Sequence, residues 1–158
     1  KWHCFVSHCW SMGQSQAQFV VSQLKLHVAG IRPWLDVQQL DDVGKLEESV
    51  RISGVFIVFL SAGYFQSLNC RKELEAALAS QRAIVLLHEQ DDRKGGESLE
   101  KLQADCRTHC SDDSSRTTVV HNTMDLAAVD ATRRSACIFN SCSRVTPNGL
   151  AMACTGCL

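Results

Sequence analysis

The sequence predicts an α/β protein built on a doubly wound sheet of five parallel strands with helices on both faces. Short apolar segments alternate five times with segments of helical periodicity, which is typical of repeated strand–helix units. Two apolar segments, 54–61 and 83–87, have the near-continuous hydrophobic character of parallel strands buried on both faces. The 158 residues suffice for one well-buried domain and are too few for two ordinary ones.

The first half of the chain is expected to form three strands with helices between them. In chain order, the expected elements are 4–7, 11–29, 31–36, 45–53 and 54–61. The first helix is indicated by apolar residues at helical spacing and by Gly30 as its stop. The second strand is expected near a sheet edge, because Pro33 cannot donate a hydrogen bond to a neighbouring strand. A polar loop over 37–44 precedes the second helix.

The second half continues the alternation. Asn69 is a good N-cap for a helix over 70–81. The later elements are expected at 83–87 (strand), 97–106 (helix), 117–120 (strand) and 125–134 (helix), with a solvated loop over 88–96. Residues 135–158 show no periodicity, and their Cys, Ser, Gly and Asn content indicates a tail of uncertain structure. The predicted organisation is therefore a domain over 1–134 followed by this tail.

The charge and hydropathy of the chain argue against several kinds of function. The formal net charge is -1, with neither a basic face nor an acidic tail, which argues against nucleic-acid and membrane-surface binding. No apolar run is long enough to span a bilayer, and no signal peptide is visible. Because the sequence begins at Lys1 without a methionine, we expect it to be a domain of a longer protein.

The nine cysteines form no regular framework. Their odd number and irregular spacing indicate reduced thiols, and hence a cytoplasmic protein. A zinc site could be imagined around Cys106, His109 and Cys110 with later cysteines, but the spacings do not follow those of zinc motifs. We expect no metal.

Polar residues occur where the predicted strands end, and they suggest a ligand site. Ser7-His8, Asp36, Ser61 and His88 should meet at one edge of the sheet, where open α/β folds bind ligands. No G-x-G-x-x-G follows the first strand, and Gly44-Lys45 lacks the rest of a P-loop. The usual nucleotide-binding signatures are therefore absent.

Glu73 is the strongest single candidate for a functional side chain. It lies near the start of the helix over 70–81, and the loop after the third strand brings that start to the same sheet edge. Its neighbouring positions Ala76, Ala77 and Ser80 are small, so a ligand could approach closely. The helix dipole favours the ionised carboxylate there. The alternative is an ordinary surface charge at a helix start.

Three motifs, in this order, resemble those of TIR (Toll/interleukin receptor) domains. Residues 2–8, W-H-C-F-V-S-H, resemble the opening box of the family, and Trp34-Leu35-Asp36-Val37 with Leu40 and Gly44 resembles its second strand and BB loop. The positions that match the run S…Y…S-x-x-C-x-x-E-L are Ser61, Tyr64, Ser67, Cys70, Glu73 and Leu74. The resemblance covers residues 1–87 and extends more weakly to 131. It implies a flavodoxin-like sheet, assembly with other TIR domains and, as in many plant, bacterial and axon-degeneration members, NAD+ cleavage.

The resemblance also implies roles for individual residues. The glutamate of the C-x-x-E-L run is catalytic in the enzymes and maps onto Glu73. The implied substrate-binding residues are Ser7, His8, Trp10, Trp34, Asp36, Leu40, Ser61 and Cys70. The implied assembly surface, the BB loop, comprises Val37, Leu40, Asp41, Asp42, Val43 and Gly44. NAD+ is the expected substrate, with no cofactor, and Arg32, Lys45 or backbone N–H groups could neutralise its phosphates.

Two functions follow from the resemblance. The first is an NAD+ glycohydrolase, active on self-assembly, that releases nicotinamide and either ADP-ribose or a cyclic ADP-ribose. The second is a non-catalytic module that acts through TIR–TIR contacts. Glu73 and the aromatic Trp34 favour the enzyme. Cys9-Trp10, where the axon enzyme has arginines, and Asn69, where plant enzymes have tryptophan, favour the interaction module. The alternative for Trp34 itself is a half-exposed strand aromatic without a role in binding.

Overall fold

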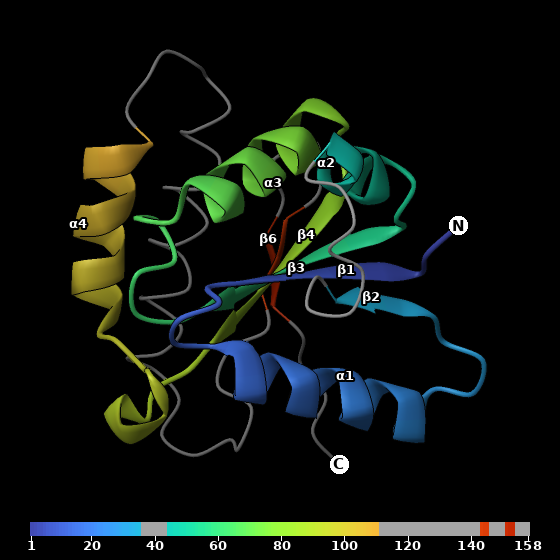
Figure 1. Ribbon diagram of the computed structural model, residues 1–158, viewed down its shortest axis with the longest axis horizontal. Helices are drawn as coiled ribbons and strands as arrows, with labels where there is room; N and C mark the ends of the chain where they lie inside the picture. Colours follow the sequence, from blue (N-terminus) through green and yellow to red (C-terminus); the bar gives the residue numbers. More distant parts are fainter. Residues whose placement is uncertain (36–43, 111–142, 146–150, 154–158) are drawn as a thin grey trace.

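Four parallel strands form the centre of the fold, in the spatial order β2-β1-β3-β4 (Figure 1). They are β1 (Cys4–His8), β2 (Pro33–Leu35), β3 (Val55–Leu60) and β4 (Ala83–His88). Two short antiparallel strands, β5 (Ser143–Val145) and β6 (Ala151–Ala153), extend the sheet beyond β4. The structure is a computed structural model that describes residues 1–35, 44–110, 143–145 and 151–153.

The helices cover both faces of the sheet. α1 (Gln14–His27) lies on one face, and α2 (Gly44–Arg51) and α3 (Leu68–Ala79) lie on the other (Figure 1). α4 (Leu99–His109) follows a short 3-10 turn, η2 (Asp92–Lys94), and packs on the same core as α3. Among the described helices, none has the length and apolar character needed to cross a membrane.

Each face of the sheet has its own apolar core. On the α1 side, Ala17 and Val21 of the helix pack against Cys4 and Val6 of β1. The larger core lies on the α2–α3 side and includes aromatic residues from β1, β2, β3 and the β3–α3 loop: Phe5, Trp34, Phe56, Tyr64 and Phe65. Because side chains alternate along a strand, neighbouring residues of β1 belong to opposite cores.

The strand order defines the place where a ligand site is expected. β1 pairs with β2 on one side and with β3 on the other, so the order in which successive strands join the sheet reverses at β1. The helices that follow β1 and β3 therefore lie on opposite faces, and a crevice opens at the carboxyl ends of these two strands. The polar side chains predicted to be functional were expected at this edge.

The predicted parallel sheet is confirmed for four strands. The expected fifth strand, 117–120, and the helix 125–134 lie outside the described residues. The strand beside β4 is β5, which is antiparallel and comes from the region 135–158 expected to be a tail. Three-residue strands are too short for an alternating pattern to reveal them.

The start of α3 differs from the sequence prediction. The N-cap is Ser67 rather than Asn69, and its side-chain oxygen accepts a hydrogen bond of 3.4 Å from the backbone N–H of Cys70. The helix ends at Ala79, and Gln81 beyond it has a positive φ of 52°. Both Ser and Asn are good N-caps, so the prediction could not decide between them from propensity.

Candidate active site

A pocket of about 340 Å³ opens where β1 ends and the β3–α3 loop runs into α3. It is lined by residues of two segments that lie far apart in sequence: His8, Cys9, Trp10, Ser11, Gly63, Gln66, Ser67, Asn69, Cys70 and Glu73. This is the edge at which the strand order places a ligand site in open α/β proteins. The volume lies at the lower end of the range for small-molecule sites.

Glu73 combines burial with access to this pocket. Its side chain is 3% exposed, although it belongs to a charged residue type that is rarely buried without partners. The Ser7 hydroxyl donates a hydrogen bond of 2.6 Å to its Oε2 atom. The Tyr64 hydroxyl lies 2.8 Å from the Ser7 Oγ atom. A strand, a loop and a helix thus meet at one carboxylate.

Two further groups near Glu73 stay neutral at ordinary pH. Burial raises the pKa of the Cys70 thiol to about 12, opposed in part by the Ser67 hydroxyl, while the negative charge of Glu73 raises it further. The Tyr64 pKa also lies well above its ordinary value, first because of burial and then because of the charges of Cys70 and Glu73. Neither Cys70 nor Tyr64 therefore supplies a negative charge to a ligand in the neutral pH range.

Ser7 and His8 serve the pocket in different ways. Ser7 points toward α3, where it contacts Glu73. The His8 side chain, one position further along β1, falls on the α1 face with Cys4 and Val6. The backbone carbonyl of His8 accepts a hydrogen bond of 3.3 Å from the Cys70 thiol. The predicted residue His8 is therefore at the pocket through its backbone.

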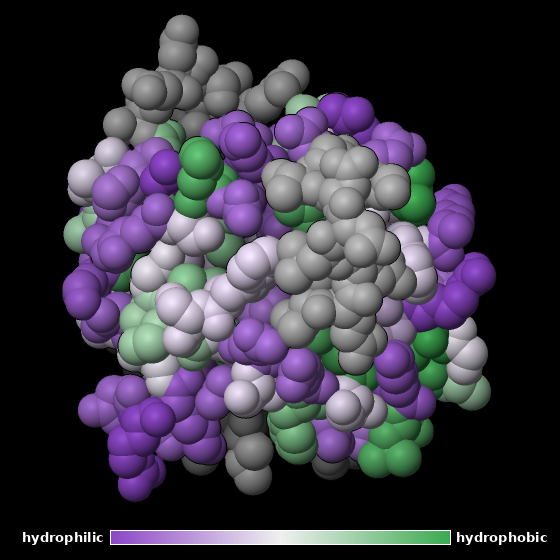
Figure 2. Space-filling view, viewed as in Figure 1, coloured by the Kyte–Doolittle hydropathy of each residue, from purple (hydrophilic) through white to green (hydrophobic). Residues whose placement is uncertain are grey.

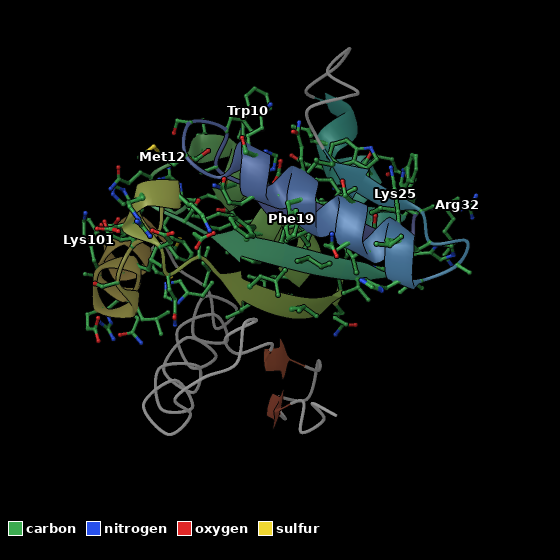
Figure 3. All side chains as sticks on the ribbon, turned by 90° about the horizontal axis from the view of Figure 1, so that it is seen from below. Trp10, Met12, Phe19, Lys25, Arg32 and Lys101 are labelled. Atoms are coloured by element: carbon green, nitrogen blue, oxygen red, sulfur yellow. The ribbon has the colours of Figure 1, made fainter. Side chains whose placement is uncertain are left out.

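Trp10 is the aromatic side chain that lines the pocket. It is 40% exposed, in the segment between β1 and α1. Figure 3 places Trp10 near the amino-terminal end of α1 and Arg32 near the opposite end. Figure 2 shows hydrophilic side chains interspersed with hydrophobic ones over the face of the molecule seen in Figure 1.

Trp34 and Ser61 do not line the pocket. Trp34 is 4% exposed, and its ring stacks on Phe5 with centroids 4.3 Å apart and planes 15° apart. It is therefore a core residue rather than a half-exposed one. Ser61 is buried near Gly13, where an added Cβ atom would lie 2.9 Å from the Ser61 Oγ atom.

Several residues predicted to be functional are not found at the pocket. Asp36, Leu40 and the remaining BB-loop residues from Val37 to Val43 lie outside the described residues, and Gly44 begins α2. Arg32 precedes β2, and its backbone N–H donates to His3 Nδ1 at the amino-terminal edge of the sheet, so it is far from the pocket. The His88 Nε2 atom lies 2.7 Å from the Glu97 carbonyl oxygen, and His88 is not part of the pocket lining.

The described residues contain no group of three His, Cys, Asp or Glu side chains that could hold a metal ion. The pocket instead has residues that the sequence analysis did not single out, among them Gly63 and Gln66. Both lie within the S…Y…S run, so their position could have been inferred from it. The contact between Tyr64 and Ser7, by contrast, has no signal in the sequence.

The comparison with known families agrees with the fold. A family model described as a TIR domain matches residues 4–119, which is most of the chain and includes every pocket-lining residue. No curated protein matches the sequence. The family match confirms the resemblance that the three motifs indicated.

Proposed function

The chain belongs to the TIR domain family, and from this premise we propose that it is an NAD+ glycohydrolase. TIR domains in general interact with other TIR domains, and the family includes enzymes that cleave NAD+. The observation that carries the proposal is the buried Glu73 carboxylate, which is hydrogen-bonded by Ser7 and lines an open pocket. A buried carboxylate at a pocket is unfavourable for folding unless partners compensate for it, so its presence favours a functional role.

The proposed reaction needs few protein groups. The bond between ribose C1′ and the nicotinamide ring nitrogen breaks, and its electron pair goes to the nitrogen. The cationic ring thus leaves as neutral nicotinamide, and no general acid is needed. The positive charge that develops on C1′ and the ring oxygen resembles that of other glycosyl transfers. The Glu73 carboxylate stabilises this charge.

The fate of the sugar determines the product. Attack of water on C1′ gives ADP-ribose with release of one proton. Attack of a nitrogen of the adenine base gives a cyclic ADP-ribose. Both products share the same first step, so both depend on Glu73.

The size of the pocket supports binding of one end of the dinucleotide. A volume of about 340 Å³ suits the nicotinamide and its ribose better than the whole of NAD+. Trp10 offers an exposed indole face at this pocket, on which an aromatic ring can stack. We propose that the rest of the site is completed on assembly, when the BB loop of a neighbouring domain approaches.

The test is release of nicotinamide from NAD+ by the purified protein, compared with the Glu73→Ala variant. Loss of release in the variant supports the proposal, and equal rates remove Glu73 from the chemistry. Turnover per molecule should rise with protein concentration or crowding. A flat dependence contradicts control by assembly.

A second candidate is a TIR module that acts through interaction alone. The side chains that favour it are Phe19 and Leu26 of α1, which are 58% and 73% exposed on the face of the sheet away from Glu73. Exposed apolar side chains of this size are frequent at protein contacts. This function predicts self-association that is unaffected by Glu73→Ala, with no nicotinamide release from either protein.

A further inference from the structure

We propose that Tyr64 is a positioning residue, which holds the Glu73 carboxylate in its reactive orientation through a directed chain of hydrogen bonds with Ser7 as its middle member. The chain consists of two short contacts: 2.8 Å between the Tyr64 hydroxyl and the Ser7 Oγ atom, and 2.6 Å from Ser7 Oγ to Glu73 Oε2. This inference rests on the proposed function, because it assigns Glu73 the catalytic role.

The direction of the chain follows from counting protons. An ionised carboxylate has no proton, so the Ser7 hydroxyl must be the donor to Glu73. A serine hydroxyl has a single hydrogen, and Ser7 has then used it. The Tyr64 hydroxyl must therefore donate to the Ser7 Oγ atom. Such aligned bonds polarise and strengthen one another in a water-poor site.

The burial of the two hydroxyl groups keeps the direction of the hydrogen-bond chain fixed. Tyr64 is fully buried and Ser7 nearly so, which excludes competing water from both hydroxyls. The pKa of Tyr64 lies well above its ordinary value because of burial and nearby charge, so the phenol retains its proton. Tyr64 in the β3–α3 loop and Cys70 on α3 are both electrostatically linked to Glu73, and burial raises the pKa of each.

The scaffold around Tyr64 is rigid. The backbone N–H of Tyr64 donates to the Ser61 carbonyl oxygen at 3.2 Å, and that of Ser67 donates to the Gly63 carbonyl oxygen at 3.1 Å. The Tyr64 ring packs edge-on against Phe65, with centroids 5.2 Å apart and an interplanar angle of 81°. Ser7 lies on the central strand β1, which is paired on both sides. The donor positions are therefore fixed before a ligand binds.

The chain has a defined consequence for Glu73. It gives one carboxylate oxygen, Oε2, a fixed donor, and it favours the ionised form of the group. Removing the Tyr64 hydroxyl weakens the Ser7 donor without removing the carboxylate or the ring. We expect Tyr64→Phe to lower kcat by about tenfold, with KM changed by less than about twofold, because a buried hydrogen bond between two neutral hydroxyls contributes about this much.

The experiment compares Tyr64→Phe, Ser7→Ala and the double variant in nicotinamide release. Because Tyr64 acts through Ser7, Tyr64→Phe should lower kcat in the wild-type background and have no further effect in the Ser7→Ala background. Phe56→Leu is the matched control: it disturbs the same apolar core at a strand residue outside the pocket, and it should lower the melting temperature while leaving kcat within about twofold. A full additive loss in the double variant, or a wild-type kcat in Tyr64→Phe, overturns the proposal.

A second measurement tests whether Tyr64 acts on the Glu73 carboxylate even if the protein does not cleave NAD+. Carbon-13 NMR of the glutamate side-chain carboxyls follows the titration of Glu73 directly, with Glu73→Gln used to assign its signal. The titration midpoint should move to higher pH in Tyr64→Phe, by about half a unit or more, and remain unchanged in Phe56→Leu. An unchanged titration midpoint in Tyr64→Phe overturns the proposed hydrogen-bond chain. If wild type and Glu73→Gln release nicotinamide at the same rate, the proposed function fails instead, and the NMR result still decides whether the chain holds the carboxylate.

Discussion

The Ser7 hydroxyl donates a hydrogen bond of 2.6 Å to the Oε2 atom of Glu73, and this contact joins residues 66 positions apart in the chain. It connects the central strand β1 with α3 across the larger core. The sequence singles out Ser7 and Glu73 separately, but it gives no sign of the contact between them. Their contact places a buried carboxylate at a pocket, and the predictions below follow from that arrangement and from the fold that holds it.

Trp10→Ala should weaken substrate binding. The exposed indole lines the pocket, and loss of stacking against an aromatic ring of NAD+ should raise KM by about tenfold while kcat stays within about threefold. The measurement is steady-state nicotinamide release. Phe19→Ala, which removes an exposed aromatic from α1 outside the pocket, is the control and should leave KM as in the wild type. An unchanged KM in Trp10→Ala removes this residue from the site.

Gly95→Ala should destabilise the protein more than Gly30→Ala. Both glycines have positive φ values, 82° and 74°, so both substitutions bring backbone strain of about 1 kcal/mol. A Cβ atom at position 95 would also lie 2.2 Å from the Met12 carbonyl oxygen, whereas nothing lies within 4 Å at position 30. The difference in the free energy of unfolding should be about 2 kcal/mol or more. Urea denaturation of both variants measures this difference. Equal losses of unfolding free energy in the two variants would contradict the close packing of Gly95 against Met12.

The cysteines should differ in their reactivity toward alkylation. Burial raises the pKa of Cys4 to about 11 and that of Cys70 to about 12, which leaves almost no thiolate near neutral pH. The Cys110 pKa is lowered, first by a hydrogen bond from Cys106 and also by the charge of Arg71. Cys110 is partly exposed as well.

Iodoacetamide at about pH 8, followed by mass spectrometry, should modify Cys110 well before Cys4 and Cys70. Denaturant should abolish the difference, which serves as the control for intrinsic reactivity. Early modification of Cys70 would show that the core beside the pocket opens readily.

The stability of the fold should decrease on mild acidification because of His8. Burial lowers the pKa of His8 below its usual value, opposed in part by the Val6 carbonyl. Below the ordinary histidine pKa of about 6.5, the unfolded chain binds a proton that the folded protein takes up only at lower pH. The free energy of unfolding due to this group is therefore fully present above about pH 6.5 and falls as the pH drops toward the folded pKa.

Urea denaturation between about pH 5 and 7.5 measures this contribution. His8→Leu should reduce the slope of stability against pH in this range, while His27→Leu, at an exposed position on α1, should leave it unchanged. An identical slope in wild type and His8→Leu contradicts the assignment.

The strands β3 and β4 of the central sheet were predictable because their sequences are almost continuously apolar. The apolar runs around β3 and β4 have the composition of strands covered on both faces, and their bounds agree with the structure within one or two residues. Glu73 could likewise be singled out as a candidate from its motif, and it lines the pocket. The alternation rule also implies that Ser7 and His8 cannot both point toward α3, so their separation could have been anticipated.

Other features depend on contacts that a sequence does not display. Trp34 was expected near a ligand, but its ring stacks on Phe5 in the core, which depends on the register of β1 and β2. The N-cap of α3 depends on how the preceding loop turns, since Ser67 and Asn69 have similar propensity. The antiparallel β5 and β6 are too short to leave a pattern.

The most direct test of the account is the initial rate of nicotinamide release from NAD+ by wild type, Glu73→Gln and Glu75→Gln over a series of protein concentrations. Glu73→Gln keeps the shape of the side chain and removes its charge, and Glu75→Gln makes the same change at an exposed position of the same helix. We predict that Glu73→Gln lowers the rate at least about a hundredfold at every concentration, while Glu75→Gln matches the wild type. Equal rates for wild type and Glu73→Gln, or no release by the wild type at any concentration, would contradict the central claim.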